Sequence, residues 1–322
     1  MNKGISVIIC TYNGDSRINK ALQSIISQNT TYNFELIVVN NNSNDRTEDE
    51  VMTTLAESTI DWTLVKESTP GLSFARWRGI EEAKFELILF CDDDNILDKN
   101  YLEIGGSILF ADQSIGILGG NGNPVFQNDK PDWFDDFSNS YAVGSLGKKS
   151  GKQVKGSYHY GASCFFRRNA LLELRKRGFN SILSDRTGTI LSSGGDVELC
   201  YAVQLLGYNL AFDTRLFFDH FIESHRLEWD YYLRLKRGIA SSFPLLEAYK
   251  VDGFENIDSF KDFLNTTFIT LLKGFLKTNF ISKKSRKNEV SRVVIKQKII
   301  SYIKNYKQTI IAFTNNKLLF EN

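Results

Sequence analysis

Residues 85–94 read Phe-Glu-Leu-Ile-Leu-Phe-Cys-Asp-Asp-Asp, an apolar run that ends directly in three carboxylates. A continuous apolar run of this length is typical of a strand buried on both faces of a parallel sheet. Neighbouring carboxylates raise one another's pKa unless a divalent cation, a helix N-terminus or solvent offsets their charge, and oxygen ligands suit Mg²⁺ or Mn²⁺. Asp92, Asp93 and Asp94 therefore suggest a metal bound to phosphate. The alternative is that they end the strand and cap a helix expected near Asp98.

The segments around this stretch alternate between strand and helix patterns. Strands are expected at 5–10, 34–39 and 62–66, and helices at 18–26, 51–55 and 73–83. This βαβα alternation predicts an α/β fold with a Rossmann-like, doubly wound and mostly parallel sheet. Ligands of such sheets bind in the crevice at the carboxyl ends of the strands, which is where Asp92 to Asp94 lie.

The second half of the chain has a different pattern. Residues 121–157 are rich in Gly, Asn, Asp and Ser and predict a long irregular connection, in which Trp133 and Phe134 either form a binding platform or anchor the loop on the core. After it we expect a strand at 160–167 and helices at 168–177 and 196–206, followed by an entirely helical pattern beyond about Phe221. The predicted domains are residues 1–225 for the α/β unit and 226–322 for an appended C-terminal helical, basic region.

Composition limits the classes of function. The chain has 322 residues, of which 42% are hydrophobic, enough for a large core. Lys and Arg total 39 against 38 acids, so we expect no nucleic-acid partner. The N-terminus has no signal-peptide pattern and no apolar run is long enough to span a membrane, which predicts a cytoplasmic protein. Residues 273–307 hold eleven Lys or Arg and one acid; they either lie on the inner face of the plasma membrane as a peripheral contact or pack normally with solvated Lys.

Six motifs resemble the family 2 glycosyltransferases in order and spacing. They are Ser6-Val-Ile-Ile-Cys-Thr-Tyr-Asn13, Val39-Asn-Asn-Asn-Ser-Asn-Asp45, Gly71-Leu-Ser-Phe-Ala-Arg76, Asp92-Asp-Asp94, Gly161-Ala-Ser-Cys-Phe-Phe-Arg-Arg168 and Gly194-Gly-Asp-Val-Glu-Leu199. The resemblance covers roughly residues 4–225. It implies a GT-A fold, a nucleotide-diphosphate sugar donor, a divalent metal (Mg²⁺ or Mn²⁺) and usually inversion at the anomeric carbon. It also suggests a saccharide or lipid-linked acceptor, as in the synthesis of a bacterial-type surface polysaccharide of the cell envelope.

The resemblance assigns the metal to the Asp-x-Asp (DXD) pattern. Asp94 is the expected direct ligand, Asp92 would face the ribose or reach the metal through water, and Asp93 would lie among the donor contacts. Some relatives carry a third ligand after the last core strand, which makes His220 a candidate, although a lone His is more often structural.

A general base must take the proton of the attacking acceptor hydroxyl. Asp196 matches the base position of the family, and it begins a predicted helix whose dipole favours a carboxylate there. Glu198 would assist the base or act only as a first-turn acid.

The remaining expected contacts are with the donor. By resemblance, Thr11, Tyr12 and Asn13 approach the nucleotide base, Arg76 approaches base or phosphate, and Gly161 with Ala162 lets the backbone pass close to the sugar. Many relatives carry an Asp after the second strand, where this chain has Asn40 and Asn41. An Asn carbonyl still accepts a hydrogen bond from uracil N3–H, so uridine is favoured.

Two other functions are compatible with parts of this pattern. A sugar-nucleotide nucleotidyltransferase would need a Gly-rich phosphate cradle after the first strand, which residues 10–14 lack. An inactive nucleotide-binding scaffold is disfavoured by the presence of both Asp94 and Asp196.

Overall fold

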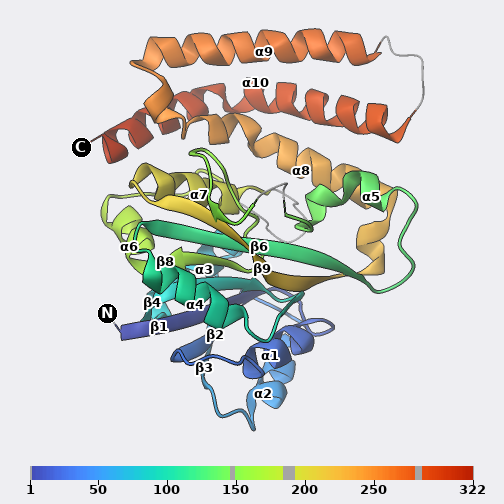
Figure 1. The fold of residues 1–322 in the computed structure, drawn as a ribbon. Helices are drawn as coiled ribbons and strands as arrows, with labels where there is room; N and C mark the ends of the chain where they lie inside the picture. Colours follow the sequence, from blue (N-terminus) through green and yellow to red (C-terminus); the bar gives the residue numbers. More distant parts are fainter. Residues whose placement is uncertain (1, 146–148, 184–192, 280–284, 322) are drawn as a thin grey trace.

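The computed structural model describes residues 2–145, 149–183, 193–279 and 285–321. Within these ranges nine strands form one mixed sheet in the order β3-β2-β1-β4-β8-β6-β9-β5, with β7 paired to β9. Helices cover both faces of this sheet, and the long C-terminal helices form a layer on one side (Figure 1).

The bounds of the elements are as follows. The strands are β1 (Asn2–Thr11), β2 (Phe34–Asn40), β3 (Asp61–Lys66), β4 (Phe85–Asp92), β5 (Asn95–Leu97), β6 (Ile115–Phe126), β7 (Gly151–Lys152), β8 (Cys164–Arg167) and β9 (Asn209–Ile222). The helices are α1 (Ile18–Ile26), α2 (Thr47–Leu55), α3 (Leu72–Glu82), α4 (Tyr101–Ala111), α5 (Phe134–Phe137), α6 (Arg168–Lys176), α7 (Gly195–Leu205), α8 (Trp229–Glu247), α9 (Ile257–Asn279) and α10 (Arg286–Phe320). Short 3₁₀ turns are η1 (Ser138–Tyr141), η2 (Ser224–Leu227) and η3 (Val251–Gly253).

The first half of the sheet has the predicted doubly wound arrangement. Strand β1 pairs in parallel with β2 and β4, and β2 pairs in parallel with β3. Successive side chains of a strand point to opposite faces, so Val7 and Ile9 pack with α1 and α4, whereas Ile8 packs with α3 on the other face. Both faces are buried, which explains why β1 and β4 are continuous apolar runs.

The second half of the sheet differs from the expectation of a long loop after residue 121. Strand β6 continues to Phe126 and pairs in parallel with β9, with Asn121 opposite Phe217 and Phe126 opposite Ile222. This part of β6 contains Gly, Asn and Pro, so its strand conformation comes from pairing with a distant segment and not from local preference. The strand expected at 160–167 is shorter than predicted, because Ser163 has a left-handed φ of 52° and β8 begins only after it.

The alternative role of the carboxylate triplet as a helix cap does not fit the structure. Strand β5 follows the triplet and pairs with β9, and α4 begins only at Tyr101 with Asn100 at its N-cap position. Asp92 therefore ends β4, and Asp93 with Asp94 forms the turn between β4 and β5.

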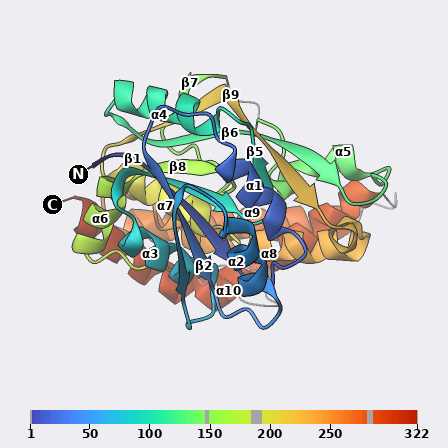
Figure 2. The same cartoon turned by 90° about the horizontal axis from the view of Figure 1, so that it is seen from below.

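The C-terminal region is helical, as predicted. Figure 1 shows α9 as the outermost helix, α10 beneath it and α8 between α10 and the sheet, and Figure 2 places all three behind the sheet when it is seen from below. The stacked rings of Phe260 and Phe313, whose centroids are 4.0 Å apart, join α9 to α10. Over the described residues, each helix is too short or too polar to cross a membrane.

Candidate active site

A cavity of about 1030 Å³ lies at the carboxyl ends of β1 and β4, and we call it the central cavity. One side is formed by these strand ends together with the N-terminal parts of α3 and α7, and the opposite side by α8 and α10. The sequence-predicted residues that line it are Thr11, Tyr12, Asn41, Arg76, Asp92, Asp93, Asp94, Gly161, Ala162, Asp196 and His220. Segments far apart in the chain are thus brought to one place, as expected for the strand ends of a doubly wound sheet.

Asn13 and Asn40 are outside the cavity lining and shape the neighbouring loop instead. Asn13 Oδ1 accepts a hydrogen bond from the Asn44 amide at 3.0 Å. Asn40 Oδ1 accepts from the Ser43 amide at 2.9 Å, and its Nδ2 donates to Glu48 Oε1 at 2.5 Å. The side chains of both residues are therefore engaged in the loop that joins β2 to α2.

Asn41 lines the cavity, but its side-chain amide is also used by the protein. Its Oδ1 accepts from the Gly71 amide at 2.8 Å, and its Nδ2 donates to the carbonyls of Glu67 and Thr69 at 3.0 and 2.7 Å. Gly71 has φ 138°, a conformation that favours glycine. Asn41 thereby fixes the turn that begins α3, the helix carrying Arg76.

Asp93 is an anchor between the triplet and the first loop. Arg17 donates to both of its oxygens at 2.9 Å, and Thr11 Oγ1 donates to Oδ2 at 2.6 Å. Burial raises the pKa of Asp93, although the Arg17 guanidinium opposes this shift. Arg17 also donates to the carbonyls of Tyr12 and Asn13, so the pair fixes the loop after β1.

Asp94 is held from the opposite side by residues at and after the end of β9. Its Oδ2 accepts from Arg226 Nη1 at 2.6 Å and from His220 Nε2 at 3.2 Å. Burial raises the pKa of Asp94, but His220 and Arg226 outweigh it and hold this pKa well below its usual range. Within the described ranges, the buried Asp94 Oδ1 has no hydrogen-bond partner.

These contacts fit a metal that is held largely by its substrate. In the part of the chain that the structure describes, no three His, Cys, Asp or Glu side chains are grouped as a metal cage. Mg²⁺ commonly uses one or two carboxylates and completes its shell with water and phosphate oxygens. The Asp94 Oδ1 atom, buried beside the same cavity as Asp92, suits that kind of site.

Asp196 stands in the first turn of α7 with both carboxylate oxygens oriented by backbone amides. Oδ2 accepts from the Gly161 amide at 2.7 Å and Oδ1 from the Val197 amide at 2.9 Å. A Cβ atom on Gly161 would lie 2.5 Å from Arg76 Nη2 and 2.9 Å from Asp196 Cβ. Glycine at position 161 therefore allows Arg76, Asp196 and the backbone to meet at one wall of the cavity.

Glu198 has a structural position. It is buried, does not line the cavity, and accepts hydrogen bonds from Ser181 Oγ, the Ile182 amide at 2.8 Å and Tyr249 Oη at 2.6 Å. Burial raises its pKa to about 7. Glu198 thus ties α7 to the segment before it and to the end of α8.

The aromatic segment after β6 anchors its loop on the core. Trp133 is 5% exposed, and its ring centroid lies 5.2 Å from that of Trp229 and 5.4 Å from that of Tyr232. Phe134 is also buried. Buried rings of this kind are not available to stack on a sugar, so the anchoring interpretation is the one that the structure supports.

Sequence reasoning missed Arg17, Arg226 and the lysines of α8 and α10 that line the cavity. Arg226 contacts Asp94 across 132 positions of sequence, and a single Arg in a polar turn gives no local signal of such a contact. The lysines lie on amphipathic helices, where Lys is ordinarily solvated.

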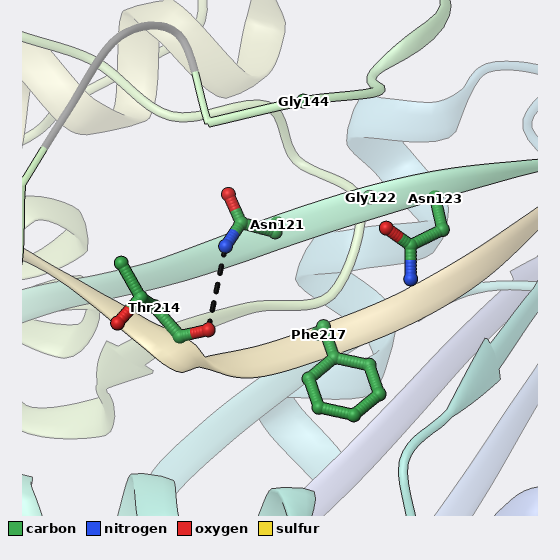
Figure 3. A pocket seen from close by; sticks show the side chains of 6 residues that line it. All are labelled: Asn121, Gly122, Asn123, Gly144, Thr214 and Phe217. Carbon is green, nitrogen blue, oxygen red and sulfur yellow. Dashed lines mark hydrogen bonds between the residues drawn. The ribbon is translucent and has the colours of Figure 1, made fainter.

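A second, shallower hollow lies between β6, β9 and the segment near Gly144 (Figure 3). It has a volume of about 370 Å³ and is lined by Asn121, Gly122, Asn123, Gly144, Thr214 and Phe217. None of these side chains titrates near neutral pH, so this hollow has no group for acid–base chemistry.

Comparisons with known proteins agree with this arrangement. The family model of "Glycosyl transferase family 2" matches residues 6–175, more than half of the chain. Among curated proteins, the chain is 31% identical over 99 residues to the putative glycosyltransferase EpsH of Bacillus subtilis (31% of this chain, 28% of EpsH). It is 31% identical over 117 residues to the Escherichia coli glucosyltransferase WfgD (36% of this chain, 45% of WfgD). The matches span less than half the length of these relatives.

Solved structures show the same fold over nearly the whole chain. Staphylococcus aureus TarS 1-349 in complex with UDP-GlcNAc gives a TM-score of 0.54 at 15% identity, covering 99% of this chain and 90% of that one. The Pyrobaculum calidifontis mannosyltransferase PcManGT, solved with GDP-Man and Mn²⁺, gives 0.54 at 14% identity, covering 99% and 75%. These similarities confirm the predicted GT-A fold with its C-terminal helices. By its family match and its fold, the chain belongs to glycosyl transferase family 2 and is an enzyme of the glycosyltransferase type.

Proposed function

We propose that the enzyme transfers a sugar from a nucleotide-diphosphate sugar, with UDP as the favoured nucleotide, to a hydroxyl group of a saccharide or lipid-linked acceptor, with inversion. The observation that carries this proposal is that Asp94 and Asp196 line the same cavity. TarS was solved with UDP-GlcNAc and PcManGT with GDP-Man, which supports a nucleotide-sugar donor for a chain of the same fold.

The proposed step is a direct displacement. The acceptor hydroxyl oxygen forms a bond to the anomeric carbon as the bond from that carbon to the diphosphate oxygen breaks, and the electron pair leaves with the diphosphate. The proton of the hydroxyl passes to the carboxylate of Asp196, which acts as the general base. The Gly161 and Val197 amides hold this carboxylate in a fixed orientation, and attack opposite the leaving group gives inversion.

Asp94, with Asp92 beside it, would hold Mg²⁺ or Mn²⁺. Such an ion would offset the charge that develops on the departing diphosphate. His220 would act through Asp94, because its Nε2 faces Asp94 Oδ2 and thereby orients the carboxylate. Arg76 lies against the Gly161 wall, where a guanidinium would bind phosphate oxygens.

The contacts to the nucleotide base would come from the loop after β1. Thr11 and Tyr12 line the cavity, and Tyr12 is 44% exposed. An exposed ring at a cavity rim is suited to stacking on a base. The role of Asn41 would be indirect, since its amide already positions Gly71.

Calorimetry with UDP, GDP, dTDP and CDP, each with Mn²⁺, Mg²⁺ or EDTA, tests the donor site. We expect one nucleotide to bind in a metal-dependent manner and Asp94→Asn to weaken that binding.

Asp196→Asn should bind donor normally but lose transfer. Asp49→Asn, an exposed acid on α2, is the matched control. Equal transfer by wild type and Asp196→Asn would remove the base assignment, and release of pyrophosphate from a nucleoside triphosphate and a sugar phosphate would favour a nucleotidyltransferase.

We further propose a cytoplasmic enzyme that makes peripheral contact with the inner face of the plasma membrane through α9. Ile269, Leu272 and Leu276 are exposed at helical spacing, and Lys273 and Lys277 are exposed beside them. Exposed apolar side chains flanked by Lys suit an anionic lipid surface.

Vesicle flotation tests this contact. Anionic vesicles at low salt should carry the protein, and Ile269→Ser with Leu276→Ser should abolish flotation, whereas Met52→Ser on α2 should not. Absence of flotation of the wild type at low and high salt alike would exclude the contact.

A further inference from the structure

The wall of the central cavity that faces the strand ends is both apolar and basic. It is lined by Lys236, Ile239 and Phe243, which lie on one face of α8, and by Val294 and Lys298 of α10. The helical region therefore lines the space in which the reaction would occur.

Lys236 and Lys298 are both partly buried, and burial lowers the pKa of each. Lys236 Nζ donates to Ser140 Oγ at 3.3 Å, and Lys298 Nζ lies 3.5 Å from the centroid of the Phe243 ring. Within the described residues, neither ammonium group forms a salt bridge with a carboxylate.

Three other cations of the cavity have such partners. Arg17 is paired with Asp93 at 2.9 Å, Arg226 with Asp94 at 2.6 Å and Lys250 with Glu247 at 2.5 Å. Glu247 is the acid that acts on Lys298, where it opposes the effect of burial, but its carboxylate is already paired with Lys250. Two partly desolvated ammonium groups that repel one another thus share this wall, and a bound anion would offset their charge.

The position of α8 indicates which substrate would carry the anion. Ser242 of α8 donates to the carbonyl of Ser193, and a Cβ of Gly194 would lie 3.3 Å from Ser242 Cβ. Residues 193 and 194 directly precede α7 and Asp196. The helical wall therefore adjoins the segment that leads into the proposed base, which the acceptor hydroxyl must reach under the proposed function. Asp94 and Arg76, the proposed metal ligand and phosphate contact, lie on the strand side of the cavity.

We propose that Lys236 and Lys298 form a subsite for a phosphate group carried by the acceptor. Lys binds phosphate as a point charge, and two of them suit a compact anion with several oxygens. Ile239 and Phe243 beside them suit the carbon chain of a polyol or of an isoprenyl group. This inference rests on the proposed function, because it names the acceptor class of the same site.

Calorimetry on protein saturated with UDP and Mn²⁺ tests the subsite. The probes are glycerol 1-phosphate, farnesyl phosphate, inorganic phosphate and uncharged glycerol. Lys236→Gln with Lys298→Gln should weaken binding of glycerol 1-phosphate about tenfold or more, the size expected for losing hydrogen bonds to a charged group. UDP affinity should stay unchanged, and glycerol should not bind. Lys296→Gln and Lys304→Gln, exposed positions of α10, are the matched controls.

Lys236→Arg with Lys298→Arg should retain phosphate binding, which separates charge from folding. Equal glycerol 1-phosphate affinity of the wild type and the double Gln variant would overturn the proposal. So would glycerol 1-phosphate binding that occurs only without UDP, because the anion would then occupy the donor site. Failure of the wild type to bind UDP would instead contradict the proposed function. Tighter binding of farnesyl phosphate than of glycerol 1-phosphate would identify an isoprenyl source of the phosphate, and the reverse order a polyol source.

Discussion

Arg226 donates from Nη1 to Asp94 Oδ2 across 2.6 Å, so the turn after β9 neutralises the last carboxylate of the triplet. Both side chains are about nine-tenths buried. A buried charge is tolerated only when it is paired, and here the partner lies in η2, where the sheet ends and the helices begin.

Arg226→Met should therefore destabilise the fold strongly. Removing one partner of a buried ion pair costs roughly 3–5 kcal/mol, because the other charge remains buried. Urea denaturation would measure this loss. The double variant Arg226→Met with Asp94→Asn should lose less unfolding free energy than the two single variants lose in sum. Strictly additive losses of unfolding free energy would show that the pair is not coupled.

Glu198 should make stability depend on pH. Its pKa is raised to about 7 in the fold, against about 4.5 when unfolded, so the folded state binds more protons between these values. The stability contributed by protonated Glu198 is thus present below pH 4.5 and lost as the pH rises to 7, by roughly 3 kcal/mol. Glu198→Gln should flatten the dependence of unfolding free energy on pH between 5 and 7, and an unchanged slope would contradict the assignment.

Gly161→Ala should reduce transfer by an order of magnitude or more while the protein remains folded. The added methyl group would be 2.9 Å from Asp196 Cβ, closer than such atoms approach, and would shift the proposed base. Initial rates of transfer and of donor hydrolysis would measure the effect. Gly253→Ala, where no atom lies within 4 Å, should leave both rates intact.

Trp133→Ala should lower stability by about 3–5 kcal/mol, because it removes a buried ring from the cluster with Trp229 and Tyr232. Phe74→Ala, at an exposed ring, should change stability little. A Trp133→Ala variant as stable as the wild type would restore the interpretation of this ring as a sugar platform.

The first half of the fold was predictable because its information is local. Strands at 5–10, 34–39 and 85–91 are buried on both faces and are therefore apolar runs. The apolar residues from Ile18 to Ile26 recur at helical spacing, which indicates a helix packed on the sheet. Residue spacing alone identifies these elements. The order of these elements then brings Asp92 to Asp94 to the crevice.

The rest depends on contacts between distant segments. The pairing of β6 with β9 makes a strand of a Gly- and Asn-containing segment, and no local pattern indicates it. The side chains of Asn13 and Asn40 form hydrogen bonds within their own loop, and residue type alone does not indicate these contacts. The contact of Arg226 with Asp94 likewise joins segments 132 positions apart, and no local pattern indicates it.

The helical layer, described above as one wall of the central cavity, bears on how this enzyme would be re-engineered. Lys236 and Lys298 belong to α8 and α10, whereas Asp94 and Asp196 belong to the α/β unit. Under the proposed division of the cavity, a chimera that carries foreign helices after Leu227 would keep Arg226. It would change the part of the cavity that holds the acceptor. Acceptor choice would then be a modular property of the enzyme, exchangeable without rebuilding its chemistry.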